Sequence, residues 1–168
     1  VLTRDFEIAD GIVLAPGSYS FPNYSFNFNS AAHRWLALRS GYTFGGFYSG
    51  NYSELVAGLT VKVKGHVNLS ANVDLVRGRL PEGRFSENVY QLKADFYVSP
   101  DLGFMNYVQF DDISNTLGWS ARLHWQVSPG NDIYLVYDKN WERRWDPASR
   151  FFPLEQGGVL KVSLSIRP

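Results

Sequence analysis

The side chains that could act as nucleophiles, bases or metal ligands are few in this sequence and lie far apart. There are 3 histidines and no cysteine among the 168 residues. His33, His66 and His124 show no i,i+4 spacing and have no carboxylate close in sequence, so no metal site is predicted. The absence of cysteine excludes a thiol nucleophile, a disulfide framework and a cysteine-type zinc site.

Ser120 and His124 are the pair that would suggest hydrolysis. They share one face of a predicted strand, but four residues along a strand cover about 13 Å, too far for the hydrogen bond that activates a serine. A cross-strand Ser–His pair stays open as an alternative. Gly45-Gly46 and Gly157-Gly158 are not phosphate-binding loops, because no helix is predicted after either, and they predict strand bends or bulges. We therefore expect no enzymatic activity and no cofactor.

Charge and composition exclude further classes of protein. Lys plus Arg is 16 and Asp plus Glu is 16, so there is no basic excess to support nucleic-acid binding. Apolar residues make up 45% of the chain, yet no run approaches the roughly 18 apolar residues of a membrane-spanning helix. The aromatic share is 16%, and a structure that crosses two water–apolar boundaries has a specific use for such rings.

Apolar and polar residues alternate with period two along most of the chain, which predicts strands with one apolar and one polar face. The clearest segments are Val67–Leu75, Tyr90–Val98, Trp119–Val127 and Leu160–Ile166. Less regular segments bring the predicted count to about nine strands of roughly 9–13 residues, long enough for tilted strands that cross a bilayer. The predicted lipid-facing residues are Leu69, Val73, Leu92, Phe96, Leu123, Trp125, Val162 and Leu164. The predicted lumen-facing residues are Lys62, Asp74, Lys93, Asp95, Arg122, His124 and Lys161.

The predicted connections alternate in length along the chain. Tight turns are expected near Ser99–Asp101 and Ser128–Asn131, where Pro, Gly, Asp and Asn residues gather. Long connections are expected at Arg77–Ser86 and Lys139–Gly157. Short turns at one end and long loops at the other are typical of bacterial outer-membrane barrels. The fold class predicted is all-β, an antiparallel up-and-down transmembrane β-barrel.

The odd number of strands indicates part of a larger barrel, because single-chain bacterial outer-membrane barrels have an even number. We expect residues 1–17 to be an extracellular entry segment and residues 18–168 to be the strands of one C-terminal barrel segment. Its two outer strands, near Tyr24–Phe28 and Leu160–Ile166, should pair with the remaining strands of the barrel or with another envelope protein. Hydrocarbon cannot satisfy the backbone groups of an open edge.

The stretch before Gly157 is the most distinctive connection. It contains the candidate extracellular binding residues Trp141, Arg143, Arg144, Trp145, Phe151 and Phe152. Trp, Arg and Phe are typical anchors of binding surfaces, and aromatic rings also stack on sugars, so a glycan is a possible ligand. The alternative is a loop that folds back over the barrel mouth and packs its rings on neighbouring loops.

Four segments resemble a family of bacterial envelope proteins. They are residues 10–19 (DGIVLAPGSY), 45–50 (GGFYSG), 107–111 (YVQFD) and 130–138 (GNDIYLVYD). The family comprises long proteins of unknown function with an N-terminal carbohydrate-binding-type β-sandwich followed by an outer-membrane β-barrel. The resemblance implies that nearly all of this chain corresponds to the C-terminal part of that barrel. It carries over no catalytic residue.

Taken together, these patterns predict a protein of the bacterial outer membrane that serves as a pore, a transporter or a membrane anchor for an envelope assembly. Its partners would be the lipid bilayer and the remaining strands of the barrel. The charged residues of the polar face could set the selectivity of a pore, form a ladder of ion pairs, or lie on the solvated outside of a soluble barrel. The alternative function is a soluble β-barrel or lectin-like sandwich that binds a lipid or a glycan.

Overall fold

The protein folds almost entirely into β-strands. The computed structural model describes residues 1–9, 11–144 and 150–165. Its strands are β1 (Phe6–Ala9), β2 (Ile12–Leu14), β3 (Asn23–Asn29), β4 (Leu36–Phe47), β5 (Gly50–Val63), β6 (Val67–Leu80), β7 (Gly83–Ser99), β8 (Leu102–Asp111), β9 (Thr116–Ser128), β10 (Asn131–Arg143) and β11 (Phe151–Ser163). No helix in these ranges is long and apolar enough to span a membrane.

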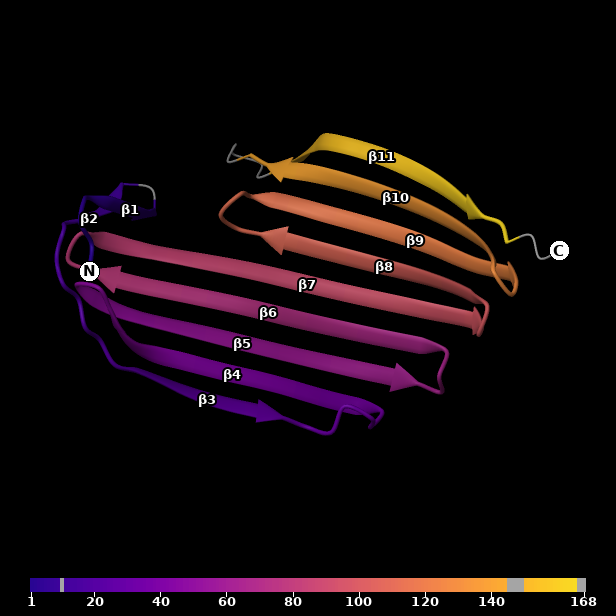
Figure 1. The fold of residues 1–168 in the computed structure, drawn as a ribbon, viewed down its shortest axis with the longest axis horizontal. Helices are drawn as coiled ribbons and strands as arrows, with labels where there is room; N and C mark the ends of the chain where they lie inside the picture. Colours follow the sequence, from indigo (N-terminus) through magenta and orange to yellow (C-terminus); the bar gives the residue numbers. More distant parts are fainter. Residues whose placement is uncertain (10, 145–149, 166–168) are drawn as a thin grey trace.

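Strands β3 to β11 form one antiparallel sheet in which each strand pairs with the next along the chain (Figure 1). This confirms the predicted all-β, up-and-down order and the count of nine strands. Within the described part of the chain, β3 pairs only with β4 and β11 only with β10, so the 9-stranded sheet is open. Closure into a barrel stays a prediction.

The predicted tight turns near Ser99–Asp101 and Ser128–Asn131 are confirmed, but the long connection predicted at Arg77–Ser86 is wrong. Strand β6 continues to Leu80 and β7 begins at Gly83, so only Pro81 and Glu82 connect them. Strands β10 and β11 likewise extend into the stretch that was expected to be a long loop. The backbone ladder continues where the simple alternation of side chains stops, and this is why the pattern ended these strands too early. In Figure 1 the β6–β7 hairpin extends beyond the neighbouring β8–β9 hairpin.

The register gives the two faces of the sheet very different chemistry. Directly paired residues share a face, so rows of partners can be followed across strands. One row runs through Leu38, Leu59, Ala71, Leu92, Val108 and Trp119. The adjacent row on the other face runs through Thr60, Ser70, Lys93, Tyr107, Ser120 and Asp138. We call these the apolar face and the polar face.

The register also assigns the predicted lipid-facing and lumen-facing residues to faces. The apolar face carries Leu69, Val73, Leu92, Phe96, Leu123, Trp125 and Val162. The polar face carries Lys62, Asp74, Lys93, Asp95, Arg122, His124 and Lys161. Leu164 follows the last residue of β11. Contact with lipid or with a lumen stays a prediction for both sets.

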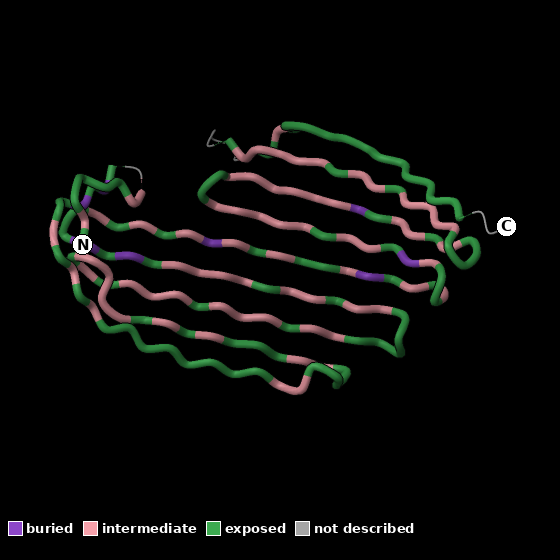
Figure 2. Tube along the Cα trace, viewed as in Figure 1, coloured by how far each residue is buried: buried purple, intermediate pink, exposed green. Residues whose placement is uncertain are grey.

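Few residues of the sheet are buried (Figure 2). Among the residues that the structure describes, the buried hydrophobic ones are Ile12, Leu14, Leu80 and Ala121. Large side chains of the apolar face remain open, with Phe26 at 66% and Leu92 at 58% exposure. On the polar face, by contrast, Asp95 is only 4% exposed. Contiguous exposed apolar surface of this extent marks an interface with another molecule or with a membrane.

Strands β1 and β2 form a separate hairpin that packs beside the tip of the β6–β7 hairpin (Figure 1). Its inward side chains Ile12 and Leu14 are buried, and so is Leu80 at the end of β6. Gly83 permits this approach, because a Cβ at that position would lie 2.9 Å from Cγ1 of Ile12. The expected entry segment therefore has an apolar core of its own, while its extracellular location stays a prediction.

Candidate functional site

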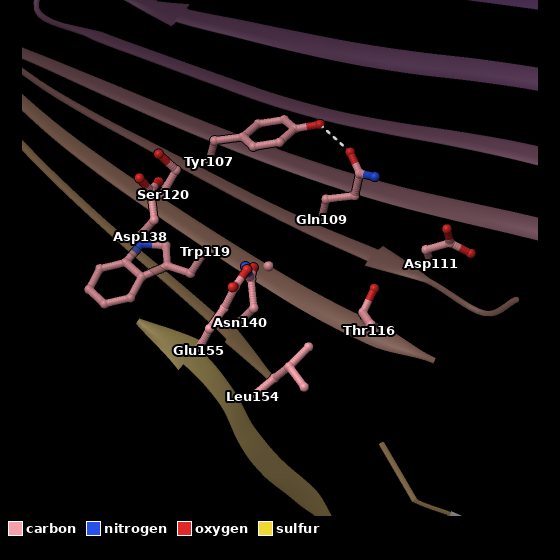
Figure 3. Close-up of a pocket in the computed structure, with 11 residues that line it drawn as sticks. Tyr107, Gln109, Asp111, Thr116, Trp119, Ser120, Asp138, Asn140, Leu154 and Glu155 are labelled. Carbon is pink, nitrogen blue, oxygen red and sulfur yellow. Dashed lines mark hydrogen bonds between the residues drawn. The ribbon is translucent and has the colours of Figure 1, made fainter. Parts of the chain in front are cut away.

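A cavity of about 470 Å³ lies across the four consecutive strands β8, β9, β10 and β11 (Figure 3). It is lined by Tyr107, Gln109 and Asp111 of β8, Thr116, Gly118, Trp119 and Ser120 of β9, Asp138 and Asn140 of β10, and Leu154 and Glu155 of β11. Most of these side chains belong to the polar face, since Tyr107, Ser120 and Asp138 form one cross-strand row. The cavity is thus built from rigid strands rather than from loops.

A glycine opens the middle of the cavity. Gln109, Gly118, Asn140 and Glu155 follow one another as cross-strand partners in the neighbouring row. A Cβ on Gly118 would lie 2.9 Å from Oδ1 of Asn140, so a larger residue would displace that amide. The missing side chain in the centre of a polar row leaves room for the Asn140 amide.

The polar groups of the cavity are mostly acceptors. Tyr107 Oη donates to Gln109 Oε1 at 2.5 Å, and Asn140 Nδ2 donates to Glu155 Oε1 at 2.8 Å. Asp111, Asp138 and Glu155 bring three carboxylates, and the lining contains no lysine or arginine. Such a lining favours cations and hydroxyl donors over anions.

The residues weighed for catalysis and metal binding lie apart. The cross-strand partners of Ser120 are Tyr107 and Asp138, so no histidine faces it. His124 instead places Nε2 2.8 Å from Asp132 Oδ1, and its ring stacks on Tyr134 with centroids 4.4 Å apart. Across residues 1–9, 11–144 and 150–165, no group of three or more potential metal ligands is gathered. The geometry offers no activated serine at this position.

The charges of the polar face are only partly paired. Lys93 Nζ lies 3.1 Å from Asp95 Oδ2, and Lys62 Nζ donates to the Ala32 carbonyl oxygen at 2.6 Å. Asp74 and Asp95 each keep an Oδ1 that is closed to solvent and has no hydrogen-bond partner in the described part of the chain. Buried oxygens of this kind call for an ordered water or a cation. Among the described residues, the ion pairs of the polar face, Lys93–Asp95 and His124–Asp132, do not connect into a continuous ladder.

The candidate glycan-binding residues belong mainly to strand ends, not to a free loop. Trp141 and Arg143 lie in β10, and Phe151 and Phe152 lie in β11, with Arg143 directly opposite Phe151. Trp145 lies outside the described residues. The rings already have neighbours: Arg144 lies 5.1 Å over the Phe152 ring, and Lys139 lies 5.2 Å over the Trp141 ring. These contacts favour packing within the hairpin, and glycan binding there stays a prediction.

The sequence pattern missed an exchange of chemistry between the two faces at the β4–β7 end. On the apolar face, residues beyond Leu55, Leu75 and Tyr90 are polar or charged: Asn51, Ser53, Arg77, Arg79, Arg84, Ser86 and Asn88. On the polar face, the rings of Phe47, Tyr52 and Phe85 pack together. The centroid of the Phe47 ring lies 5.5 Å from that of Tyr52 and 6.1 Å from that of Phe85. The sequence does carry a signal for this exchange. Beyond Leu75 and before Tyr90 the residues still alternate with period two, but the positions that were apolar become polar and the polar ones become mostly apolar.

These features define an all-β protein with an open antiparallel sheet that has one apolar and one polar face, the latter with an acidic cavity. No protein-family model matches the chain, and comparison with curated proteins and with solved structures gave no match either. The resemblance to envelope proteins with an outer-membrane barrel therefore stays a prediction.

Proposed function

We propose that this chain forms part of the wall of a transmembrane β-barrel in a bacterial outer membrane. The observation that carries the proposal is the apolar face, which continues across the nine strands while its large side chains stay exposed. The apolar stretches on this face are Leu36–Phe44, Leu55–Val63, Val67–Leu75, Tyr90–Val98 and Leu102–Phe110. Their lengths match the roughly 9–11 residues that a tilted strand needs to cross a bilayer.

A soluble fold would need a second layer over the same area, because domains bury the apolar side of a sheet against another element. The described residues include only one other element, the β1–β2 hairpin, which packs at the tip of β6–β7 and not over the apolar face. The size of the face and its predominantly apolar character support lipid chains as this second layer. The soluble barrel or lectin-like sandwich is the competing outcome of the tests below.

The polar face would line the water-filled interior of the complete barrel. Its acidic cavity supports the passage of cations or polyhydroxylated solutes over a purely structural role as a membrane anchor. We assign it no catalytic reaction. The remaining strands of the barrel would come from the same polypeptide or from another envelope protein.

A nitroxide scan along β6 would test the membrane placement. Labels at Leu69, Ala71 and Val73 should be accessible to oxygen dissolved in lipid, and labels at Ser70 and Asn72 to a water-soluble nickel complex. Beyond Leu75 the two faces exchange character, so labels at Arg77 and Arg79 should be accessible to the nickel complex although they share the register of Leu69. Accessibility is measured by power-saturation EPR of the protein in phospholipid vesicles.

A scan of the protein without vesicles provides the control, because the lipid signal should then disappear. Water accessibility at Leu69 and Ala71 in vesicles would contradict the membrane assignment and favour the soluble alternative. A lipid signal that continues to Arg79 would contradict the proposed boundary alone.

Cysteine cross-linking would test how the barrel closes. The natural sequence has no cysteine, so an introduced pair is free of competition. Phe26→Cys with Tyr42→Cys joins directly opposed residues of β3 and β4 and should oxidise to a disulfide. Phe26→Cys with Leu160→Cys joins the two outer strands of the sheet and should remain reduced, because each edge pairs with a further strand. An intramolecular disulfide in the second variant, detected by mobility in non-reducing electrophoresis, would show a barrel closed by these nine strands.

A further inference from the structure

Three arginines stand just beyond the apolar stretch on the same face of the sheet. Arg77 and Arg79 lie on β6 and Arg84 lies on β7, and all three are exposed. The register places Arg79 directly opposite Arg84. We propose that these residues, the arginine patch, bind the phosphate of an anionic lipid whose acyl chains lie on the apolar face. This inference rests on the proposed membrane location.

The charges of the patch are not compensated by the protein. Like charges directly opposite one another on neighbouring strands destabilise a sheet. Within the described part of the chain, the side chains of Arg79 and Arg84 make no ion pair and no hydrogen bond. A bound anion between the two guanidinium groups would remove the repulsion. The arrangement is therefore one that an anion stabilises.

The third arginine is held in place beside them. Arg77 Nη1 donates to Asn88 Oδ1 at 2.6 Å and to the Val76 carbonyl oxygen at 2.8 Å. Asn88 is itself anchored, since its backbone nitrogen donates to Asp112 Oδ1 at 2.7 Å. These bonds use only one nitrogen of the guanidinium group and leave its other donors for a ligand.

A hollow adjoins the patch and supplies further polar groups. Its volume is about 410 Å³, and Asn51, Ser53, Arg77 and Arg79 line it together with Phe44, Gly45 and Tyr52. Asn51 lies opposite Arg79 and Ser53 opposite Arg77 on the neighbouring strand. Guanidinium groups bind phosphate oxygens in a bidentate manner, and amide and hydroxyl donors beside them complete such a site.

The position of the patch selects a lipid over a soluble ligand. Arg77 lies two residues beyond Leu75, and Arg79 four, which is roughly 7 and 14 Å along a tilted strand. At a tilt of about 45° these lengths put the two arginines about 5 and 10 Å above Leu75, within and at the outer edge of a headgroup layer about 5–8 Å thick. A lipid seated there would lay its chains on Leu55, Leu75 and Tyr90. A phosphate monoester carries about −1.5 to −2 charges near neutral pH and thus matches two uncompensated arginines better than a zwitterionic headgroup does.

Native mass spectrometry of the detergent-solubilised full chain would test the proposal. The probe is phosphatidic acid, which carries a phosphate monoester, and phosphatidylcholine is the zwitterionic comparison. Arg79→Gln with Arg84→Gln should weaken phosphatidic acid binding at least about tenfold for each arginine removed. Arg34→Gln with Arg122→Gln removes the same charge at the β3–β4 turn and on the polar face, away from the patch, and should leave binding unchanged. Arg79→Lys with Arg84→Lys keeps the charge and should retain part of the affinity.

The contrary outcomes are distinct. Equal binding by the wild type and the double glutamine variant, or an equal loss in the Arg34 and Arg122 control, would overturn the site. Inorganic phosphate that displaces phosphatidic acid at matched concentration would identify a soluble anion as the ligand and overturn the lipid assignment. Flotation with phosphatidylcholine vesicles separates the two proposals. A wild-type chain that fails to float contradicts the membrane location, whereas one that floats without preferring phosphatidic acid contradicts the patch alone.

Discussion

Replacing Leu92 by arginine is expected to lower the free energy of unfolding in a lipid bilayer by about 2–4 kcal/mol. Leu92 lies on β7 in the middle of the apolar face, between Ala71 and Val108 of the neighbouring strands. Its side chain is 58% exposed, so in water the same change would alter stability by only about 0.5 kcal/mol. The size of the effect therefore reports whether lipid or water covers this position. The measurement is urea unfolding of the protein in phospholipid vesicles, followed by tryptophan fluorescence.

Two matched variants complete this experiment. Gln91→Arg adds the same charge to the adjacent residue on the polar face, between Asn72 and Gln109, and should have little effect. Tyr90→Arg places it near the boundary of the apolar stretch, where the cost should fall to about 1 kcal/mol or less. If arginine lowers the free energy of unfolding equally at Leu92 and at Gln91, the proposal that lipid covers only the apolar face is wrong.

Replacing Leu14 by alanine is expected to weaken the docking of the β1–β2 hairpin on the sheet by about 2–5 kcal/mol. The free energy of unfolding of the large sheet should not change. Leu14 is fully buried in the small core that Ile12 and Leu80 share, and no strand of the large sheet depends on β1 or β2 for its pairing. The undocked population should rise about 30-fold to a few thousand-fold. Hydrogen exchange of peptides from residues 1–17 should become correspondingly faster, while exchange in β8–β10 should not change.

Val13 provides the control, since it lies between the two buried residues of β2 and is 46% exposed. Val13→Ala should alter hairpin exchange by no more than a typical surface substitution does. If Leu14→Ala accelerates exchange in β8–β10 as strongly as in the hairpin, the N-terminal segment and the sheet unfold as one unit, and the hairpin is not an independent element.

Much of the sheet could be predicted because the alternation of apolar and polar residues can be recognised within each strand separately. Val67–Leu75 and Tyr90–Val98 each alternate cleanly, and the register joins their apolar residues on one face. Hairpin order followed from short turns such as Ser128–Asn131, where β9 and β10 do meet. Local alternation and turn chemistry are properties of neighbouring residues, so no knowledge of the rest of the fold was needed.

Other features depend on partners that a single strand does not reveal. Around Phe104–Phe110 apolar residues occur in both phases, and only the register assigns Phe104 and Val108 to the apolar face. Asn106 lies between them on that face, where its Oδ1 accepts from Trp119 Nε1 at 3.4 Å. The cavity is likewise composed from four strands, and its acidic character appears only once Asp138 and Glu155 are placed together. The face of each β8 residue and the acidity of the cavity therefore depend on which residues lie opposite on the neighbouring strands.

The strict chain order of the sheet has a consequence for how the protein is made. Every strand from β3 to β11 pairs with the strand next to it in sequence, so the sheet can grow hairpin by hairpin, with few long loops to close. The strand pairing of high sequence separation would be the one that covers the outer edges of β3 and β11. Until it forms, both edges are templates for any other extended chain. If the barrel closes as proposed, this last strand pairing would be the slow step of assembly, and an assembly catalyst or a holding chaperone would act there.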